Sequence, residues 1–159
     1  MMSSGSANIT CRDAVIADMT ACAGILNRWI DATPWMPRVH AAADVERYYR
    51  ETVFADRAIV VADREGEVVG FLALSPEAYV TALYVDERHR KGGVGARLLR
   101  EAKKRAPDEL KLWTFERNAD AHRFYEREGF VAVKRTDGEN EEGLPDILYS
   151  WYAAGGERA

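Results

Sequence analysis

The stretch that decides the fold is Arg90-Lys91-Gly92-Gly93-Val94-Gly95-Ala96. It follows an apolar segment, residues 79–85, that is predicted to be a strand, and it opens an amphipathic helix predicted over residues 93–105. Three glycines in four positions leave backbone N–H groups uncovered, and a helix N-terminus adds positive partial charge. This pattern predicts a phosphate-binding turn, although a ligand-free strand–helix turn could use the same glycines.

The charge around this turn favours a ligand that carries phosphate. Residues 88–105 contain eight Lys or Arg and one Glu, in a chain whose net charge is −4. Lys103, Lys104 and Arg105 are expected to belong to a solvated helix face. The acidic total argues against a dedicated nucleic-acid-binding protein, and we expect no nucleic-acid partner.

Two other phosphate-binding motifs fit poorly. A P-loop requires Gly-Lys-Ser/Thr, whereas Val94 and Gly95 follow Gly93. A dinucleotide fingerprint requires a third glycine where this chain has Leu98, and the hairpin predicted upstream is wrong for that fold.

Length and composition indicate one globular domain. The chain has 159 residues, of which 47% are hydrophobic and 30% charged. We expect a single domain over residues 9–152, with disordered segments at residues 1–8 and 153–159. The sequence has no apolar run of membrane-spanning length and no signal-peptide pattern, which predicts a cytoplasmic protein without a membrane partner. Cys11 and Cys22 would then be reduced, and no cluster of ligands predicts a metal site.

Hydrophobic periodicity predicts a mixed α/β fold with a central, mostly antiparallel sheet. The sheet would contain about six or seven strands, flanked by about four helices, and a β-α-β unit would run through the glycine turn. The predicted strands are residues 9–12, 58–63, 67–74, 79–85, 109–116, 130–135 and 147–152. The predicted helices are a first one that starts at Asp13 or Asp18 and ends near residue 30, and residues 44–54 (capped by Asp44), 93–105 and 118–128.

Two motifs carry a resemblance to a known family. Residues 90–96 fit Q/R-x-x-G-x-G/A, and residues 118–130, Asn-Ala-Asp-Ala-His-Arg-Phe-Tyr-Glu-Arg-Glu-Gly-Phe, fit N-x-x-A-x-x-F-Y-E-x-x-G-F. The chain thus resembles the GNAT superfamily of acetyl-CoA-dependent N-acetyltransferases over residues 9–152. The resemblance implies a GNAT fold, acetyl-CoA as co-substrate and no metal.

The resemblance also implies roles for individual residues. Backbone N–H groups in the glycine turn would hold the pyrophosphate, and Leu83 and Val85 would pair with the pantetheine arm. The Val85 N–H would face the thioester oxygen, and Asn118 would bind near the pantetheine arm. The implied cofactor-binding set is Leu83, Tyr84, Val85, Arg90, Lys91, Gly92, Gly93, Val94, Gly95, Ala96, Asn118, Ala121, Phe124 and Tyr125.

Tyr125 is the candidate catalytic residue, since a phenol beside the sulfur can protonate the leaving thiolate. Without the motif, a buried core tyrosine would be the simpler interpretation. The base is undecided: many family members have a carboxylate where this chain has Thr81, which leaves Glu116, His40 or water. His122 is expected at the surface.

The acceptor is predicted to be a primary amine of a small molecule that attacks directly in a ternary complex. In this family the region between the first two helices often lines the acceptor site, and here it offers Trp35, Met36 and His40. Residues 137–146 form an acidic loop that is either simply solvated or attracts a cationic amine. The end of the chain resembles that of bacterial GNAT proteins without an assigned acceptor. The alternatives are a protein or peptide amine and a non-catalytic acyl-CoA-binding module, and a homodimer is expected by analogy.

Overall fold

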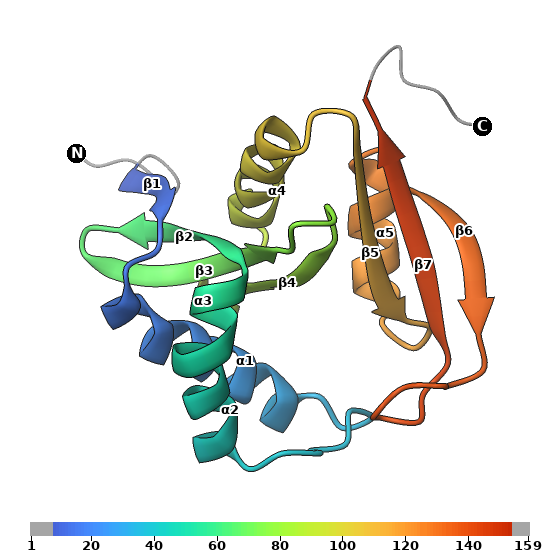
Figure 1. Ribbon diagram of the computed structural model, residues 1–159, viewed down its shortest axis with the longest axis horizontal. Helices are drawn as coiled ribbons and strands as arrows, with labels where there is room; N and C mark the ends of the chain where they lie inside the picture. Colours follow the sequence, from blue (N-terminus) through green and yellow to red (C-terminus); the bar gives the residue numbers. More distant parts are fainter. Residues whose placement is uncertain (1–7, 154–159) are drawn as a thin grey trace.

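The seven strands form two antiparallel sheets, which lie side by side in Figure 1. This computed structural model describes residues 8–153. The first sheet has the order β1-β2-β3-β4, and the second has the order β5-β7-β6. The strands are β1 (Ile9–Asp13), β2 (Ala58–Arg64), β3 (Glu67–Leu74), β4 (Val80–Val85), β5 (Glu109–Phe115), β6 (Val131–Thr136) and β7 (Asp146–Tyr152).

The two sheets meet at one point and then separate. A parallel bridge joins Tyr79 to Lys111, and the Lys111 N–H donates to the Ala78 carbonyl at 3.0 Å. Strands β4 and β5 do not otherwise pair within the described residues. The predicted parallel direction of β4 and β5 is therefore confirmed, but the predicted central sheet is split between these two strands.

All four predicted helices are present with different ends, and the one predicted over residues 44–54 is divided into α2, a π-helical turn and a short α3. They are α1 (Met19–Ala32), α2 (Ala42–Tyr48), a short α3 (Phe54–Asp56), α4 (Val94–Arg105) and α5 (Ala119–Arg127), with a π-helical turn at Tyr49–Val53 between α2 and α3. Asp44 does not cap α2, because the N-cap is Ala41 and Asp44 lies in the first turn. Asn118 does cap α5, accepting the Ala121 N–H at 3.2 Å.

Two hydrophobic clusters cover opposite faces of the first sheet. Helix α4 packs its buried Leu98 and Leu99 on one face, and α1 packs Met19 and Ile25 on the other. Alternation along the strands supplies both clusters, since successive side chains point to opposite faces. None of the described helices is long and apolar enough to cross a membrane.

Most residues of the predicted disordered ends, 1–8 and 153–159, lie outside the described part of the chain. Ala153 is described, and its N–H donates to the Asp108 carbonyl at 3.0 Å.

Candidate functional site

The glycine turn presents uncovered backbone at the start of α4. Gly93 is the N-cap of α4, with φ +84°, and a Cβ there would meet nothing within 4 Å. The first N–H groups of a helix have no partner within it, and no acidic side chain lies in the first turn of α4. The N–H groups from Val94 to Ala96 therefore form a positive, sterically open end. These residues fit a phosphate group.

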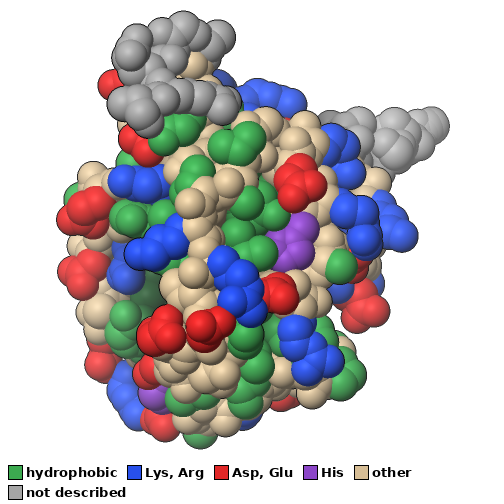
Figure 2. Space-filling view, turned by 90° about the vertical axis from the view of Figure 1, so that its right-hand side faces the viewer, with side chains coloured by type: hydrophobic (Ala, Val, Ile, Leu, Met, Phe, Trp, Pro, Cys, Tyr) green, Lys and Arg blue, Asp and Glu red, His purple; other side chains and the backbone are tan. Residues whose placement is uncertain are grey.

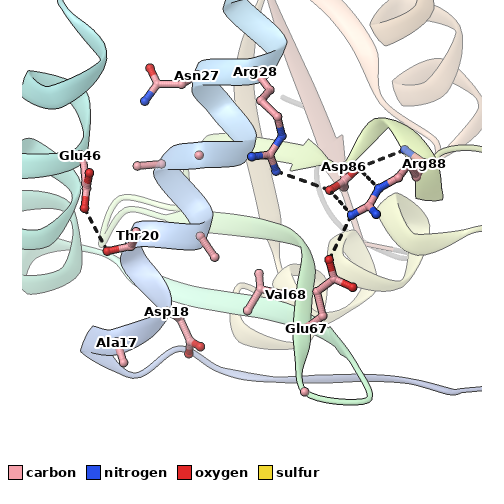
Figure 3. Close-up of a pocket in the computed structure, with 14 residues that line it drawn as sticks. Ala17, Asp18, Thr20, Asn27, Arg28, Glu46, Glu67, Val68, Asp86 and Arg88 are labelled. Carbon is pink, nitrogen blue, oxygen red and sulfur yellow. Dashed lines mark hydrogen bonds and ion pairs between the residues drawn. The ribbon is translucent and has the colours of Figure 1, made fainter.

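Asp86 anchors the beginning of this turn (Figure 3). Its buried carboxylate accepts the Arg88 backbone N–H at 3.1 Å and the Arg88 guanidinium at 3.2 and 3.3 Å. Arg28 of α1 lies 3.4 Å away on the other side, and Arg88 also contacts Glu67 at 3.0 Å. The hydrogen bonds from Arg88 are the main reason that the pKa of Asp86 is lowered. Helix α1 and the β2–β3 hairpin thus both hold the turn.

A cavity of about 710 Å³ lies beside this network, between α1 and the β2–β3 hairpin. Small side chains of α1 form one wall, and the polar groups around it are already bonded to one another: Thr20 to Glu46, and Arg28 and Arg88 to Asp86 (Figure 3). This cavity lies away from the open end of α4, and we assign it no part in the reaction.

Strand β4 offers an unpaired edge next to the glycine turn. The Asp86 N–H donates to the Val69 carbonyl of β3 at 2.8 Å. In an antiparallel strand the backbone N–H groups of alternate residues point toward the same neighbouring strand. The N–H groups of Leu83 and Val85 consequently point away from β3, toward the second sheet. On the same edge, the Val85 carbonyl accepts the Arg90 Nε–H at 3.1 Å.

Helix α5 brings Tyr125 to the same region. Gly95 allows α4 and α5 to approach closely, because a Cβ there would lie 3.3 Å from the Phe124 ring. Tyr125 is 8% exposed and packs on Phe124, Phe130 and Tyr149. Burial, with a smaller effect of Tyr84, raises the pKa of Tyr125 far above its usual range. The phenol therefore keeps its proton.

A row of aromatic rings connects the two sheets on the α1 side. Tyr84 of β4 contacts Trp29 of α1 at 5.4 Å between ring centroids, Trp29 contacts Trp35 at 5.9 Å, and Trp35 contacts Phe115 of β5 at 6.0 Å. Trp35, predicted either to pin its loop or to line the acceptor site, thus lies between the sheets.

A second cavity, of about 630 Å³, adjoins this row. Its floor includes Trp113 and Phe115 of β5, and the acidic loop contributes Glu139 and Glu142. The loop touches the segment after α1, where His40 Nε2 lies 3.1 Å from a Glu141 carboxylate oxygen. Lys134 is the basic residue among those that line the cavity. The arrangement suits a cationic group, since aromatic faces and carboxylates both attract cations.

Neither side chain named from the sequence as a candidate base is a free group. Thr81, which stands where many family members have a carboxylate, is exposed and donates to the Ala73 carbonyl at 3.4 Å. Glu116 pairs with Arg135 at 2.5 Å, and His40 is occupied by Glu141.

Two expectations about individual side chains were wrong. His122 is half-buried: its Nε2 lies 3.0 Å from the Glu116 carbonyl, and its Nδ1 lies 3.0 Å from the hydroxyl of the buried Tyr149. Lys103 is not fully solvated, because its ammonium donates to the Glu128 carbonyl at 3.0 Å and lies 4.9 Å from the Trp151 ring. Burial lowers the pKa of Lys103. His122 of α5 and Lys103 of α4 thus each contact a residue of β7, Tyr149 and Trp151 respectively. Hydrophobic periodicity within a helix does not reveal such contacts with a strand distant in the sequence.

The face that Figure 2 shows, on the side of the second sheet, has acidic and basic side chains interspersed with apolar ones. Within residues 8–153, no three His, Cys, Asp or Glu side chains are grouped as metal ligands.

Comparison with known proteins identifies the class. The Acetyltransferase (GNAT) family matches residues 25–130. Peptidyl-lysine N-acetyltransferase YiaC of Escherichia coli is 27% identical over 130 residues, covering 80% of this chain and 88% of that protein. The solution structure of apo YjaB from Escherichia coli superposes with a TM-score of 0.74 at 26% identity, covering 91% and 98% of the two chains. YncA of Salmonella typhimurium, solved with its cofactor acetyl-CoA, has a TM-score of 0.69 at 20% identity over 91% and 94%.

The chain belongs to the GNAT family of acetyltransferases. It is an acyltransferase that uses acetyl-CoA, as the resemblance implied.

Proposed function

We propose that this enzyme transfers the acetyl group of acetyl-CoA to a primary amine of a small cationic molecule, by direct attack in a ternary complex. The observation that carries the proposal is the acidic, aromatic-lined cavity whose Phe115 joins the row of rings that leads through Trp35 and Trp29 to Tyr84 of β4. Acetyl-CoA on the unpaired edge of β4 would place its thioester near the row of aromatic rings.

The donor would be held mainly by backbone groups. The N–H groups from Arg90 to Ala96 would bind the pyrophosphate at the positive end of α4. The outward N–H groups of Leu83 and Val85 would bond the pantetheine arm as an added strand would. Tyr84, Asn118, Ala121, Phe124 and Tyr125 complete the proposed donor site.

The chemistry requires a donor for the thioester oxygen and a proton for the sulfur. The Val85 N–H is proposed to stabilise negative charge on the oxygen, a contribution of about 2.7–4 kcal/mol in other acyl transfers. Tyr125 is proposed to donate its proton to the departing sulfur. The buried, protonated phenol supports that role, because a donor must keep its proton until the C–S bond breaks.

A lysine side chain of a protein or peptide is the second candidate acceptor. Its support is the similarity to YiaC, a peptidyl-lysine N-acetyltransferase that this chain matches over 88% of its length. A lysine ammonium carries the same charge as a small alkylamine and would enter the same cavity.

The test is CoA-thiol release from acetyl-CoA with amino acids, polyamines, aminoglycosides, aryl amines and lysine-containing peptides, after subtraction of release without acceptor. Release with a small alkylamine supports the first candidate, and release with peptides alone supports the second. Binding of acetyl-CoA without thiol release in the whole panel, and without acetylation of a protein lysate, would reject transfer in favour of a binding module.

A further inference from the structure

The proposed reaction leaves one requirement unmet. A primary alkylamine is an ammonium ion near neutral pH, and it must lose a proton before its nitrogen can attack. The two side chains considered from the sequence, Glu116 and His40, are engaged with Arg135 and Glu141, and Thr81 cannot accept a proton.

Three carboxylates line the second cavity: Glu139 is exposed, Asp146 is bonded to Thr136 and Asn140, and Glu142 is the remaining candidate. It is half-buried and lines the 630 Å³ cavity together with Trp113 and Phe115. No hydrogen bond or ion pair of its carboxylate is found among residues 8–153. Its neighbour Glu141 contacts His40 instead, on the outer side of the loop.

The loop holds Glu142 in a defined conformation. Asn140 donates to the Leu144 carbonyl at 2.8 Å and to Asp146 at 3.1 Å, and the Leu144 N–H donates back to the Asn140 side chain at 3.2 Å. Gly143, with φ +68°, follows Glu142 directly and closes this turn. Asn140 therefore fixes the backbone on both sides of Glu142.

The negative charge of Glu142 affects Tyr84, which precedes Val85 in β4. Burial, with the negative charge of Glu142, raises the pKa of Tyr84 to about 12. Tyr84 in turn contributes to the raised pKa of Tyr125. Tyr84 is thus within electrostatic reach of both the Glu142 carboxylate and the Tyr125 phenol.

We propose that Glu142 is the general base of this enzyme, taking the proton of the acceptor ammonium in the cavity between β5, β6 and the acidic loop. The proposal rests on the proposed function. The ammonium proton passes to the Glu142 carboxylate, and the nitrogen lone pair forms the C–N bond. The C–S bond breaks with its electron pair on sulfur, which takes the Tyr125 proton. The second nitrogen proton restores the Tyr125 phenol, and Glu142 releases its proton to water.

The test compares E142Q with E141Q, which removes the same charge from the adjacent position of the same loop. Thiol release is measured with the alkylamine of the panel that the wild type acetylates fastest, from pH 7 to 10. General bases contribute about 10²–10⁴-fold, so E142Q is expected to lose that much of kcat at pH 7. E141Q should stay within about threefold, because Glu141 is exposed and faces His40.

The pH dependence separates a base from a structural residue. The free-amine fraction of an alkylamine rises about tenfold per pH unit below its pKa near 10.4, so the deficit of E142Q should shrink by a similar factor per unit. A deficit of E142Q that is the same at pH 7 and pH 10, or equal losses of kcat in E142Q and E141Q, would overturn the assignment of Glu142 as the base. The proposed acetyl transfer itself would still stand in that case, because the wild type turns over. Lack of wild-type turnover with the whole panel would reject the proposed function and this proposal together.

Discussion

Replacement of Asp86 by Asn tests whether this carboxylate holds the glycine turn, the proposed binding site of acetyl-CoA, in its conformation. The substitution keeps the shape of the side chain and one acceptor oxygen for the Arg88 backbone N–H, but it removes the charge that attracts Arg88 and Arg28. We expect D86N to fold, to be less stable, and to bind acetyl-CoA more weakly.

The magnitude follows from the geometry of the network. Hydrogen bonds to a charged group contribute about 1.5–3 kcal/mol each. The Arg28 and Arg88 side chains are 65% and 67% exposed, so solvent screens both pairs. The expected loss in the free energy of unfolding is about 1–2 kcal/mol. For a chain of this length it lowers Tm by about 2–8 °C. A looser turn should raise the KM for acetyl-CoA about three- to tenfold, equivalent to about 0.7–1.4 kcal/mol.

The stability that Asp86 contributes should depend on pH in a direction set by its lowered pKa. The pKa of Asp86 is lowered in the folded protein, so its contribution to stability is present above the unfolded value of about 3.9. The contribution is lost as the pH falls through the lower native pKa. The difference between wild type and D86N in urea unfolding should therefore be full at pH 7 and shrink below about pH 4.

The matched control is E67Q, which removes an exposed partner of the same Arg88 and should cost less than about 1 kcal/mol without changing the KM for acetyl-CoA. A D86N protein with wild-type Tm and KM would refute the anchoring role. A stability difference that stays constant down to pH 3 would show that packing, rather than charge, is responsible.

Four further substitutions probe the donor site and the core. Y125F should lower kcat about 10²-fold or more while the Kd for acetyl-CoA, measured by calorimetry, stays unchanged; a wild-type kcat would remove the phenol from the mechanism. G93A should cost about 1–2 kcal/mol in urea unfolding, because φ is +84° there although space is open. G95A should chiefly raise the Kd for acetyl-CoA, since the new Cβ would lie 3.3 Å from the Phe124 ring that must move. L98A should cost about 2–5 kcal/mol and lower Tm, because the side chain is fully buried between α4 and the first sheet.

The elements could be predicted from the sequence because their signals are local. Glu67–Leu74 has the strand bounds that were expected, and α4 and α5 begin within one residue of their glycine and asparagine signals. The split between β4 and β5 could not be predicted, since both strands are apolar segments that would also suit a continuous sheet. The rings of Trp29 and Trp35, which link Tyr84 of β4 to Phe115 of β5 across the split, come from another part of the chain.

The site was only partly predictable for a related reason. The glycine turn and Tyr125 each lie in a contiguous motif, so each could be found from the residues next to it in the sequence. Glu142 lies more than fifty residues from Tyr84, in a loop with five acidic residues among which the sequence gives no preference. Only the fold of the loop around Asn140 distinguishes Glu142 from Glu141.

A bulge in β4 gives a reason why we propose a base from that loop rather than from this strand. Ala73 pairs with Ala82 and Leu74 with Val80, which leaves Thr81 as an extra residue. Val80 and Ala82 would share a face in a regular strand, yet Val80 belongs to the cluster under α4 and Ala82 to the cluster under α1. The alternation of side chains between the two faces of the sheet is therefore interrupted at position 81. The Thr81 side chain is exposed and donates to the Ala73 carbonyl. A carboxylate placed at position 81 should consequently not restore activity to E142Q. Recovery of thiol release in a T81E/E142Q double variant would contradict this explanation.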